Sequence, residues 1–115
     1  MIGILVRREK ESNLRKRLLD EGVEFYEEKD RFHTLFLFPS GLPADPSEGK
    51  KVYLVDDSIQ EIELSGKTFA IRGSRESIER FAPLLEAKGM LVDLENPDLT
   101  LEIRKWGKKF LISVF

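Results

Sequence analysis

Apolar residues recur along this chain in two rhythms, one typical of strands and one typical of helices. The run at 2–6 is apolar and predicts a buried strand. Leu14 and Leu18 then recur among charged residues, which predicts a helix that ends at Gly22. Strand-like segments follow on both sides of a polar turn at residues 29–31, which predicts a hairpin. The first part of the chain thus predicts strand, helix, strand and strand at residues 2–6, 9–21, 23–28 and 32–38.

The second part repeats this order after a loop at 39–49 that is rich in proline and glycine. Ser74 is a suitable N-cap for a helix whose apolar stripe begins at Ile78, and Gly89 follows the end of that helix. Pro83 lies inside the stripe, so the pattern predicts either a kinked helix or two shorter ones. Strands are predicted at residues 51–55, 67–72, 90–94, 99–105 and 110–115.

The segment 92–103 contains the most specific turn of the sequence. Pro97 fixes its own φ at about −65° and keeps Asn96 out of the helical region. Asn96 and Asp98 are residue types whose side chains bond to nearby backbone groups. From Leu99 onward, apolar residues alternate with polar ones, which is the pattern of a strand with one buried face. We therefore predict that Asn96, Pro97 and Asp98 form a structural turn between two neighbouring strands.

These patterns together predict an α+β fold. It has a mixed β-sheet, two main helices and a β-α-β-β arrangement that is used twice. The N-terminal α/β half is predicted at residues 1–60 and the second half at 61–115. A chain of 115 residues suits one compact unit with a single core.

Two segments of the second half resemble the THUMP domain family, the RNA-binding module of tRNA-modifying enzymes such as the 4-thiouridine synthetases. They are the strand 66–72, which ends in Arg72, and the strand, Asn-Pro-Asp turn and strand at 92–103. The resemblance implies a THUMP-like second half and a reduced ferredoxin-like first half. It is a resemblance to a reduced form, because only residues 73–75 stand where the family has a longer basic loop.

Composition and charge restrict the functions that this chain can perform. A net charge of −2 excludes a nucleic-acid binder that relies on bulk attraction to phosphate, so any RNA contact must be local. The chain has no cysteine and His33 is its only histidine, which leaves no thiol nucleophile and no Cys/His metal cluster. The glycines do not form a phosphate-binding loop. We therefore expect a non-catalytic chain with no cofactor and no metal site.

Location and source are also suggested by composition. No apolar run approaches the roughly 20 residues that a membrane-spanning helix needs. Met1 leads directly into a strand-like segment, so we expect a cytoplasmic protein with no membrane partner. Charged residues make up 35% of the chain while Gln60 is its only glutamine, a bias seen in proteins of thermophiles.

Cations near two predicted strand ends are the candidates for local RNA contact. The resemblance implies such a role for Arg72, as the strand-end arginine, and for Arg75, in the shortened basic loop. Around the closing turn, Trp106 and Phe110 lie between basic residues and are candidates for stacking; the alternative is a polar hairpin tip with Trp106 folded over the sheet. The basic segment 7–17 has two interpretations, a solvated helix face or a phosphate-contacting patch. The candidate RNA-binding residues are Arg72, Arg75, Arg80, Arg104, Lys105, Trp106, Lys108 and Lys109.

The prediction is thus a non-catalytic module that binds tRNA or another structured RNA and assists a tRNA-modifying enzyme in cis or in trans. An alternative stays open, because the apolar segment 112–115 invites a partner enzyme or a second copy of the chain. The chain would then be a protein-interaction or oligomerisation subunit without RNA binding. The sequence also fits the N-terminal piece of a longer enzyme.

Overall fold

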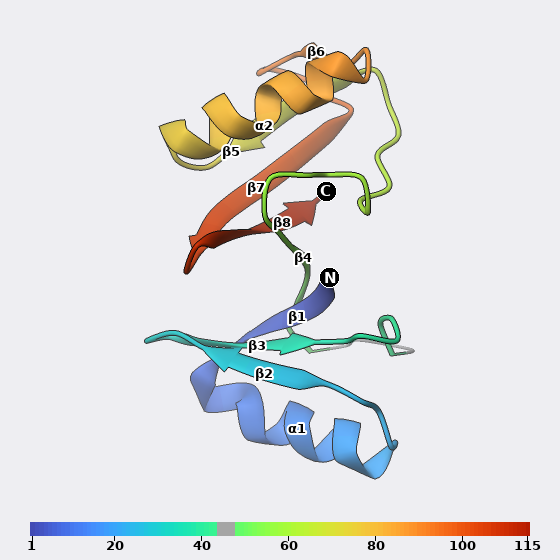
Figure 1. The fold of residues 1–115 in the computed structure, drawn as a ribbon, viewed down its shortest axis with the longest axis vertical. Coiled ribbons are helices and arrows are strands. Elements are labelled where there is room, and N and C mark those ends of the chain that lie inside the picture. The colour runs from blue at the N-terminus through green and yellow to red at the C-terminus, as the bar shows by residue number, and fades with distance from the viewer. Residues whose placement is uncertain (44–47) are drawn as a thin grey trace. The chain divides into compact units, whose positions relative to one another are not determined.

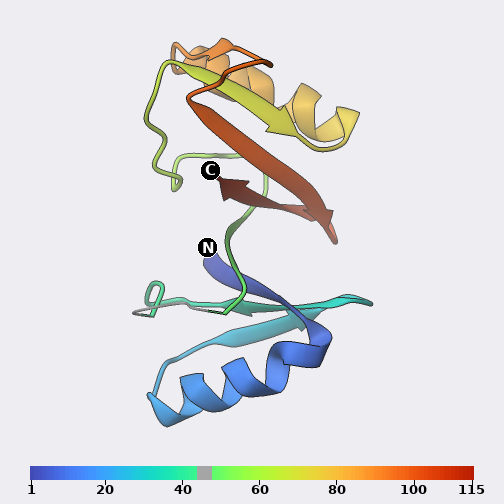
Figure 2. The same ribbon diagram turned by 180° about the vertical axis from the view of Figure 1, so that it is seen from behind.

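The computed structural model describes residues 1–43 and 48–115, which form two compact units, Met1–Val52 and Tyr53–Phe115. Part of the predicted loop at 39–49 lies outside these described residues. In each unit, one α-helix covers one face of a group of strands (Figures 1 and 2). The division falls earlier in the chain than the predicted one after residue 60, and Ile59 belongs to the core of the second unit.

The first unit has the predicted order of strand, helix, strand and strand. Its elements are β1 (Ile2–Arg7), the 3-10 turn η1 (Arg8–Lys10), α1 (Glu11–Asp20), β2 (Tyr26–Lys29) and β3 (His33–Leu37). β3 pairs antiparallel with β1 on one side and with β2 on the other, so its predicted central position is confirmed. The core lies between α1 and this sheet and consists of Ile4, Val6, Leu14, Leu18, Phe36 and Phe38.

The second unit repeats the order and adds one further strand. Its elements are β5 (Thr68–Arg72), α2 (Arg75–Ala87), β6 (Leu91–Val92), β7 (Leu99–Trp106) and β8 (Lys109–Val114). β7 and β8 form an antiparallel hairpin, and β8 also pairs with the later residues of β4 (Lys50–Val55). β5 pairs parallel with both β7 and β6. The predicted α+β class, with a mixed sheet, two main helices and the repeated β-α-β-β arrangement, is confirmed.

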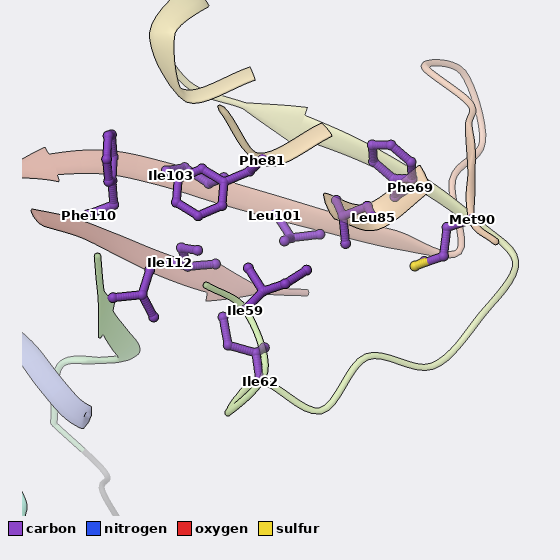
Figure 3. Close-up of a cluster of buried hydrophobic side chains, with 11 residues drawn as sticks. Ile59, Ile62, Phe69, Phe81, Leu85, Met90, Leu101, Ile103, Phe110 and Ile112 are labelled. Atoms are coloured by element: carbon purple, nitrogen blue, oxygen red, sulfur yellow. The ribbon is translucent and has the colours of Figure 1, made fainter. Parts of the chain in front are cut away.

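Figure 3 shows the core of the second unit between α2 and the sheet. Phe81 extends from α2 toward the sheet and is fully buried, as is Leu101 of β7. The ring of Phe81 meets that of Phe110 edge-on, with centroids 5.1 Å apart and an interplanar angle of 82°. Ile59 and Ile62, from the segment after β4, complete this core.

α2 begins where its sequence predicts and continues past its proline. The Ser74 Oγ accepts a hydrogen bond from the Ser77 N–H at 3.2 Å, which confirms Ser74 as the N-cap. Pro83 lies inside one continuous helix, so the alternative of two short helices is wrong. Proline has no N–H, so one internal hydrogen bond is missing at Pro83, and the buried face formed by Phe81 and Leu85 stabilises the helix despite this loss.

Candidate nucleic-acid interface

The Asn-Pro-Asp segment connects β6 to β7, and these two strands lie on opposite sides of β5. The prediction of a turn between neighbouring strands is therefore wrong. Leu91 and Val92 align with Thr68 and Phe69 on one side, and Leu99 aligns with Phe69 on the other. The connection thus crosses β5 near its beginning. Periodicity along a chain indicates which face a residue occupies, but it does not determine which strands become neighbours.

Asp98 fixes this crossing to the start of β5. Its carboxylate accepts hydrogen bonds from the N–H groups of Lys67 and Thr68, at 2.7 and 3.2 Å. The N–H of Asp98 donates in turn to the Thr68 Oγ1 at 2.8 Å. The backbone N–H of Lys67, and then that of Thr68, lower the pKa of the Asp98 carboxyl. Asp98 therefore has the predicted structural role, through bonds to a distant strand.

The first half of the crossing depends on Asp93, which the sequence analysis did not identify. One carboxylate oxygen of Asp93 accepts hydrogen bonds from the N–H groups of Glu95 and Asn96, at 3.1 and 3.0 Å. Such a bond from an aspartate to the backbone two or three residues later is a known turn signal. The Asp-x-x-Asn spacing in the sequence was the available clue.

Two of the predicted cations meet at the ring of Phe110. The Arg80 Cζ lies 5.2 Å from the ring centroid, and the Lys105 Nζ lies 5.4 Å from it. Lys105 also donates a hydrogen bond to the Glu76 Oε1 at 3.0 Å. Because Phe110 is only 1% exposed, its ring offers no face to a base, and the stacking role considered for it is wrong.

Lys105 and Phe110 align with each other and lie on one face of the sheet. Three other predicted cations share the opposite face. Arg72 aligns with Glu102, which lies two residues before Arg104 on β7. Lys109 aligns with Trp106, two residues further along. Side chains that align across strands, or that lie two apart on one strand, point to the same face. Arg72, Arg104 and Lys109 therefore lie on one face of three adjacent strands, and all three are exposed.

The two remaining predicted cations, Arg75 and Lys108, differ in their surroundings. Arg75 pairs with Glu79 at 2.9 Å, and both side chains are largely exposed. Lys108 follows Gly107 in the two-residue loop of the β7–β8 hairpin and is exposed. Within residues 1–43 and 48–115, no ion pair involves the set that we call the sheet-end cations, namely Arg72, Arg104, Lys108 and Lys109.

The sheet-end cations lie at the end of the second unit where β5 finishes and the β7–β8 hairpin turns. Figures 1 and 2 both place the beginning of α2 and the hairpin tip on the same side of this unit. Trp106 does not join them as a stacking surface, since it is 8% exposed. This burial favours the second interpretation of the closing turn, in which Trp106 folds over the sheet, over RNA contact through its ring. By the register above, Trp106 lies on the same face of β7 as Arg104, but its ring is buried there.

Two arginines of α1, within the basic segment 7–17, are paired with acidic side chains. Arg15 donates two hydrogen bonds to the carboxylate of Glu27, at 2.6 and 2.9 Å. This pairing raises the pKa of Arg15 and lowers that of Glu27. Arg17 lies 3.9 Å from Glu21. These contacts favour the solvated helix face over a phosphate-contacting patch along α1.

Acidic side chains and the histidine are the groups with which this cysteine-free chain could bind a metal ion. Among the residues that the structure describes, no three such side chains are grouped closely enough to hold a metal ion. The described helices include none that is long and apolar enough to cross a membrane.

The same fold occurs in solved structures of larger proteins. One is a 4-thiouridine synthetase, solved as an RNA complex with bound ATP, with a TM-score of 0.64 and 16% sequence identity over 99% of this chain. The fold is THUMP-like. PH1313 from Pyrococcus horikoshii shares it with a TM-score of 0.61 and 18% identity over 100% of this chain. This chain spans 40% and 54% of the lengths of those two chains. No family model matches it, and neither does any curated protein sequence.

Proposed function

We propose that this chain is a non-catalytic module that binds tRNA or another structured RNA and assists a tRNA-modifying enzyme, in cis or in trans. The observation that carries the proposal is the group of sheet-end cations on a THUMP-like second unit. The similar 4-thiouridine synthetase was solved in complex with RNA, which supports the same class of ligand here. The reaction itself belongs to another domain or to a partner enzyme.

Local charge at this end of the sheet suits phosphate contact despite the net charge of −2. Arg72, Arg104 and Lys109 project from three adjacent strands, and Lys108 extends the group into the hairpin loop. Arginine and lysine at such positions can each neutralise one phosphate and release its counterions. The group runs across the ends of β5, β7 and β8, so we expect it to follow the backbone of a folded RNA.

Arg75, Arg80 and Lys105 extend this contact surface toward α2. The ion pairs of Arg75 with Glu79 and of Lys105 with Glu76 are both solvent-exposed. Exposed pairs of this kind contribute roughly 0–1 kcal/mol, so an incoming phosphate can replace the carboxylate at small cost. Glu76 and Glu79 would then keep these cations ordered in the absence of RNA.

The test is a titration of labelled tRNA with the chain at several salt concentrations, followed by fluorescence anisotropy. We expect weak binding with a marked salt dependence. The double variant Lys108→Ala and Lys109→Ala should bind more weakly and lower the salt slope by roughly 0.7–0.9 for each lost phosphate contact. Arg72→Ala combined with Arg104→Ala should act in the same direction.

The matched control removes two lysines from the opposite end of the same unit. Lys67 precedes β5 and Lys88 follows α2, and both are exposed. The variant Lys67→Ala and Lys88→Ala changes net charge by the same amount as the loop variant. If the two double variants weaken tRNA binding equally, or if the chain binds no RNA at low salt, the proposal is wrong.

A protein-interaction role is the second candidate, because the outer strand of the second unit exposes apolar side chains. Leu91, Val92 and Leu94 in and after β6 are 68%, 52% and 78% exposed. An uncovered apolar edge of this kind is typical of a surface that meets another protein. Light scattering over a range of concentrations would test it. Self-association that Leu94→Ser abolishes, and that Leu19→Ser on α1 does not, would favour this role; a monomer at every concentration would contradict association between copies.

A further inference from the structure

The tip of the β2–β3 hairpin in the first unit exposes an aromatic ring. One carboxylate oxygen of Asp30 accepts hydrogen bonds from the N–H groups of Phe32 and His33, at 2.8 and 2.6 Å. The Asp30 N–H donates to the His33 carbonyl oxygen at 3.0 Å and closes the turn. The side chain of Phe32 is 64% exposed, although the strand that follows it is buried. A fixed turn that exposes a large aromatic ring suggests a binding role for the ring.

A second element holds this tip in place. The Arg8 N–H donates to the Phe32 carbonyl oxygen at 3.0 Å. Arg7, at the end of β1, aligns directly with His33 at the start of β3. In Figures 1 and 2 the hairpin tip extends on the side where β1 ends and α1 begins. The backbone on both sides of the tip is therefore preorganised.

A pocket of about 320 Å³ lies at this junction and is lined by Arg7, Glu9, Phe32 and His33. This volume is at the lower end of the range for pockets that bind small molecules. The Arg7 side chain is 75% exposed, and its contact with Glu9 is long, at 4.0 Å. The His33 Nδ1 is buried and lies 3.6 Å from a carboxylate oxygen of Asp30, beyond hydrogen-bond distance, so His33 contributes to the wall of the pocket. The pocket thus combines an aromatic face with a cation and with polar groups that a ligand can engage.

Arg31 adds a second guanidinium to the exposed ring. Its Cζ lies 5.3 Å from the centroid of the Phe32 ring. Aromatic rings and arginine planes are the surfaces on which unpaired RNA bases stack. A carboxylate such as that of Glu9 accepts hydrogen bonds from base amino groups or ribose hydroxyls, and Arg7 can bind a phosphate bidentately.

We propose that this pocket binds one unpaired nucleotide. The base stacks on Phe32 beside Arg31, the phosphate contacts Arg7, and Glu9 engages polar groups of the base or ribose. A free nucleotide and a nucleotide within a single strand share this chemistry. One part of the inference rests on the proposed function, namely that the nucleotide belongs to an RNA. It would then be an unpaired nucleotide of the same RNA that the sheet-end cations contact.

The test uses the full chain and NMR chemical shifts. Nucleoside 5′-monophosphates, inorganic phosphate and a short single-stranded oligoribonucleotide are each titrated against it. We expect the nucleotides and the oligonucleotide to shift the amide signals of Arg8, Phe32 and His33, and phosphate alone to bind more weakly. Phe32→Ala and Phe32→Leu should each weaken nucleotide binding by at least about fivefold, because both remove the stacking ring.

Matched controls separate this pocket from general effects. Tyr26→Ala removes another exposed aromatic from the same hairpin and should leave nucleotide affinity unchanged, as should Lys16→Ala on α1. Equal affinity of Phe32→Leu and the unchanged chain, or equal losses in Phe32→Ala and Tyr26→Ala, would overturn the proposal. Circular dichroism confirms that each variant is folded.

The outcome is distinguishable from that of the proposed function. The double variant Lys108→Ala and Lys109→Ala should weaken tRNA binding and leave monophosphate binding intact. Phe32→Ala, in contrast, should weaken monophosphate binding. Nucleotide binding without tRNA binding would reject the proposed function and retain the pocket. If tRNA binds, but neither the monophosphates nor the single strand shifts the amide signals of Phe32 or His33, the pocket is rejected and the proposed function is retained.

Discussion

Asp98 and Thr68, from segments 30 residues apart, each donate a backbone N–H to the side chain of the other. The N–H of Asp98 reaches the Thr68 Oγ1 at 2.8 Å, and the N–H of Thr68 reaches the Asp98 carboxylate at 3.2 Å. Together with the Lys67 N–H, this reciprocal contact joins the beginning of β5 to the beginning of β7. The stability of the second unit should therefore depend on the ionised form of Asp98.

The Asp98→Asn variant should be less stable at neutral pH, with a lower midpoint of thermal unfolding. The pKa of Asp98 is lowered from its ordinary value of 3.8 by the N–H groups of Lys67 and Thr68. Because the folded pKa is depressed, this stabilisation is present above the unfolded value and is lost as pH falls through the folded pKa. The difference between the two proteins should thus shrink below about pH 4. Asp56→Asn is the control, and a difference that is independent of pH would contradict this account.

Gly66→Ala should destabilise the second unit, because the backbone conformation of Gly66 and the space around it are both unsuitable for a residue with a Cβ. The φ of Gly66 is +119°, and an added Cβ would stand 2.8 Å from the Asp98 Cβ. A residue with a Cβ at positive φ costs about 1–2 kcal/mol, and displacement of Asp98 adds to this. Gly89 also has a positive φ, but an added Cβ there meets nothing within 4 Å. The difference between Gly66→Ala and Gly89→Ala in urea unfolding therefore measures the cost of displacing Asp98. Equal losses would contradict the contact with Asp98.

Thr34→Val should raise the pKa of Glu11 toward its ordinary value of 4.5. The buried hydroxyl of Thr34 donates to the Glu11 carboxylate and is the largest cause of its lowered pKa, with Lys29 and Arg15 contributing. Thr34→Ser retains the hydroxyl and should retain the lowered pKa. Carboxyl NMR titration of the three proteins checks this. A Glu11 pKa that is the same in all of them would assign the shift to the cations instead.

Phe81→Ala should cost about 3–5 kcal/mol in the free energy of unfolding, as is usual for the loss of a buried phenylalanine. Phe81 is fully buried and meets the Phe110 ring edge-on. Ile78 lies on the same helix but is 41% exposed, so Ile78→Ala should cost much less. Chemical denaturation gives both values. Comparable losses would mean that α2 is not fixed to the sheet by Phe81.

Local structure was predictable wherever one residue type determines it. Ser74 caps α2 because a serine before an apolar helical stripe has a specific N–H to accept from, and the turn at Asp30 follows from the same side-chain chemistry. Asp93 makes the same kind of bond but was not identified. The neighbouring Asn-Pro-Asp motif was the stronger signal and hid it.

Arrangement between distant segments was less predictable. The insertion of β5 between β6 and β7 depends on pairing across about 30 residues, which no periodic pattern encodes. The sequence left two interpretations of Trp106, a stacking surface or a ring folded over the sheet, because its neighbours are lysines, and the choice between them required the structure. The candidate cations could be named from the sequence, whereas their division between two sheet faces required the strand register.

The central position of β5 also constrains when the second unit can form. During synthesis β5 leaves the ribosome well before either of its neighbours, so no hairpin can protect it and its parallel pairing must wait for the C-terminal strands. Parallel pairings of distant segments form slowly and leave strand edges open meanwhile. The second unit should therefore close in a single late step, after β7 and β8 have left the ribosome.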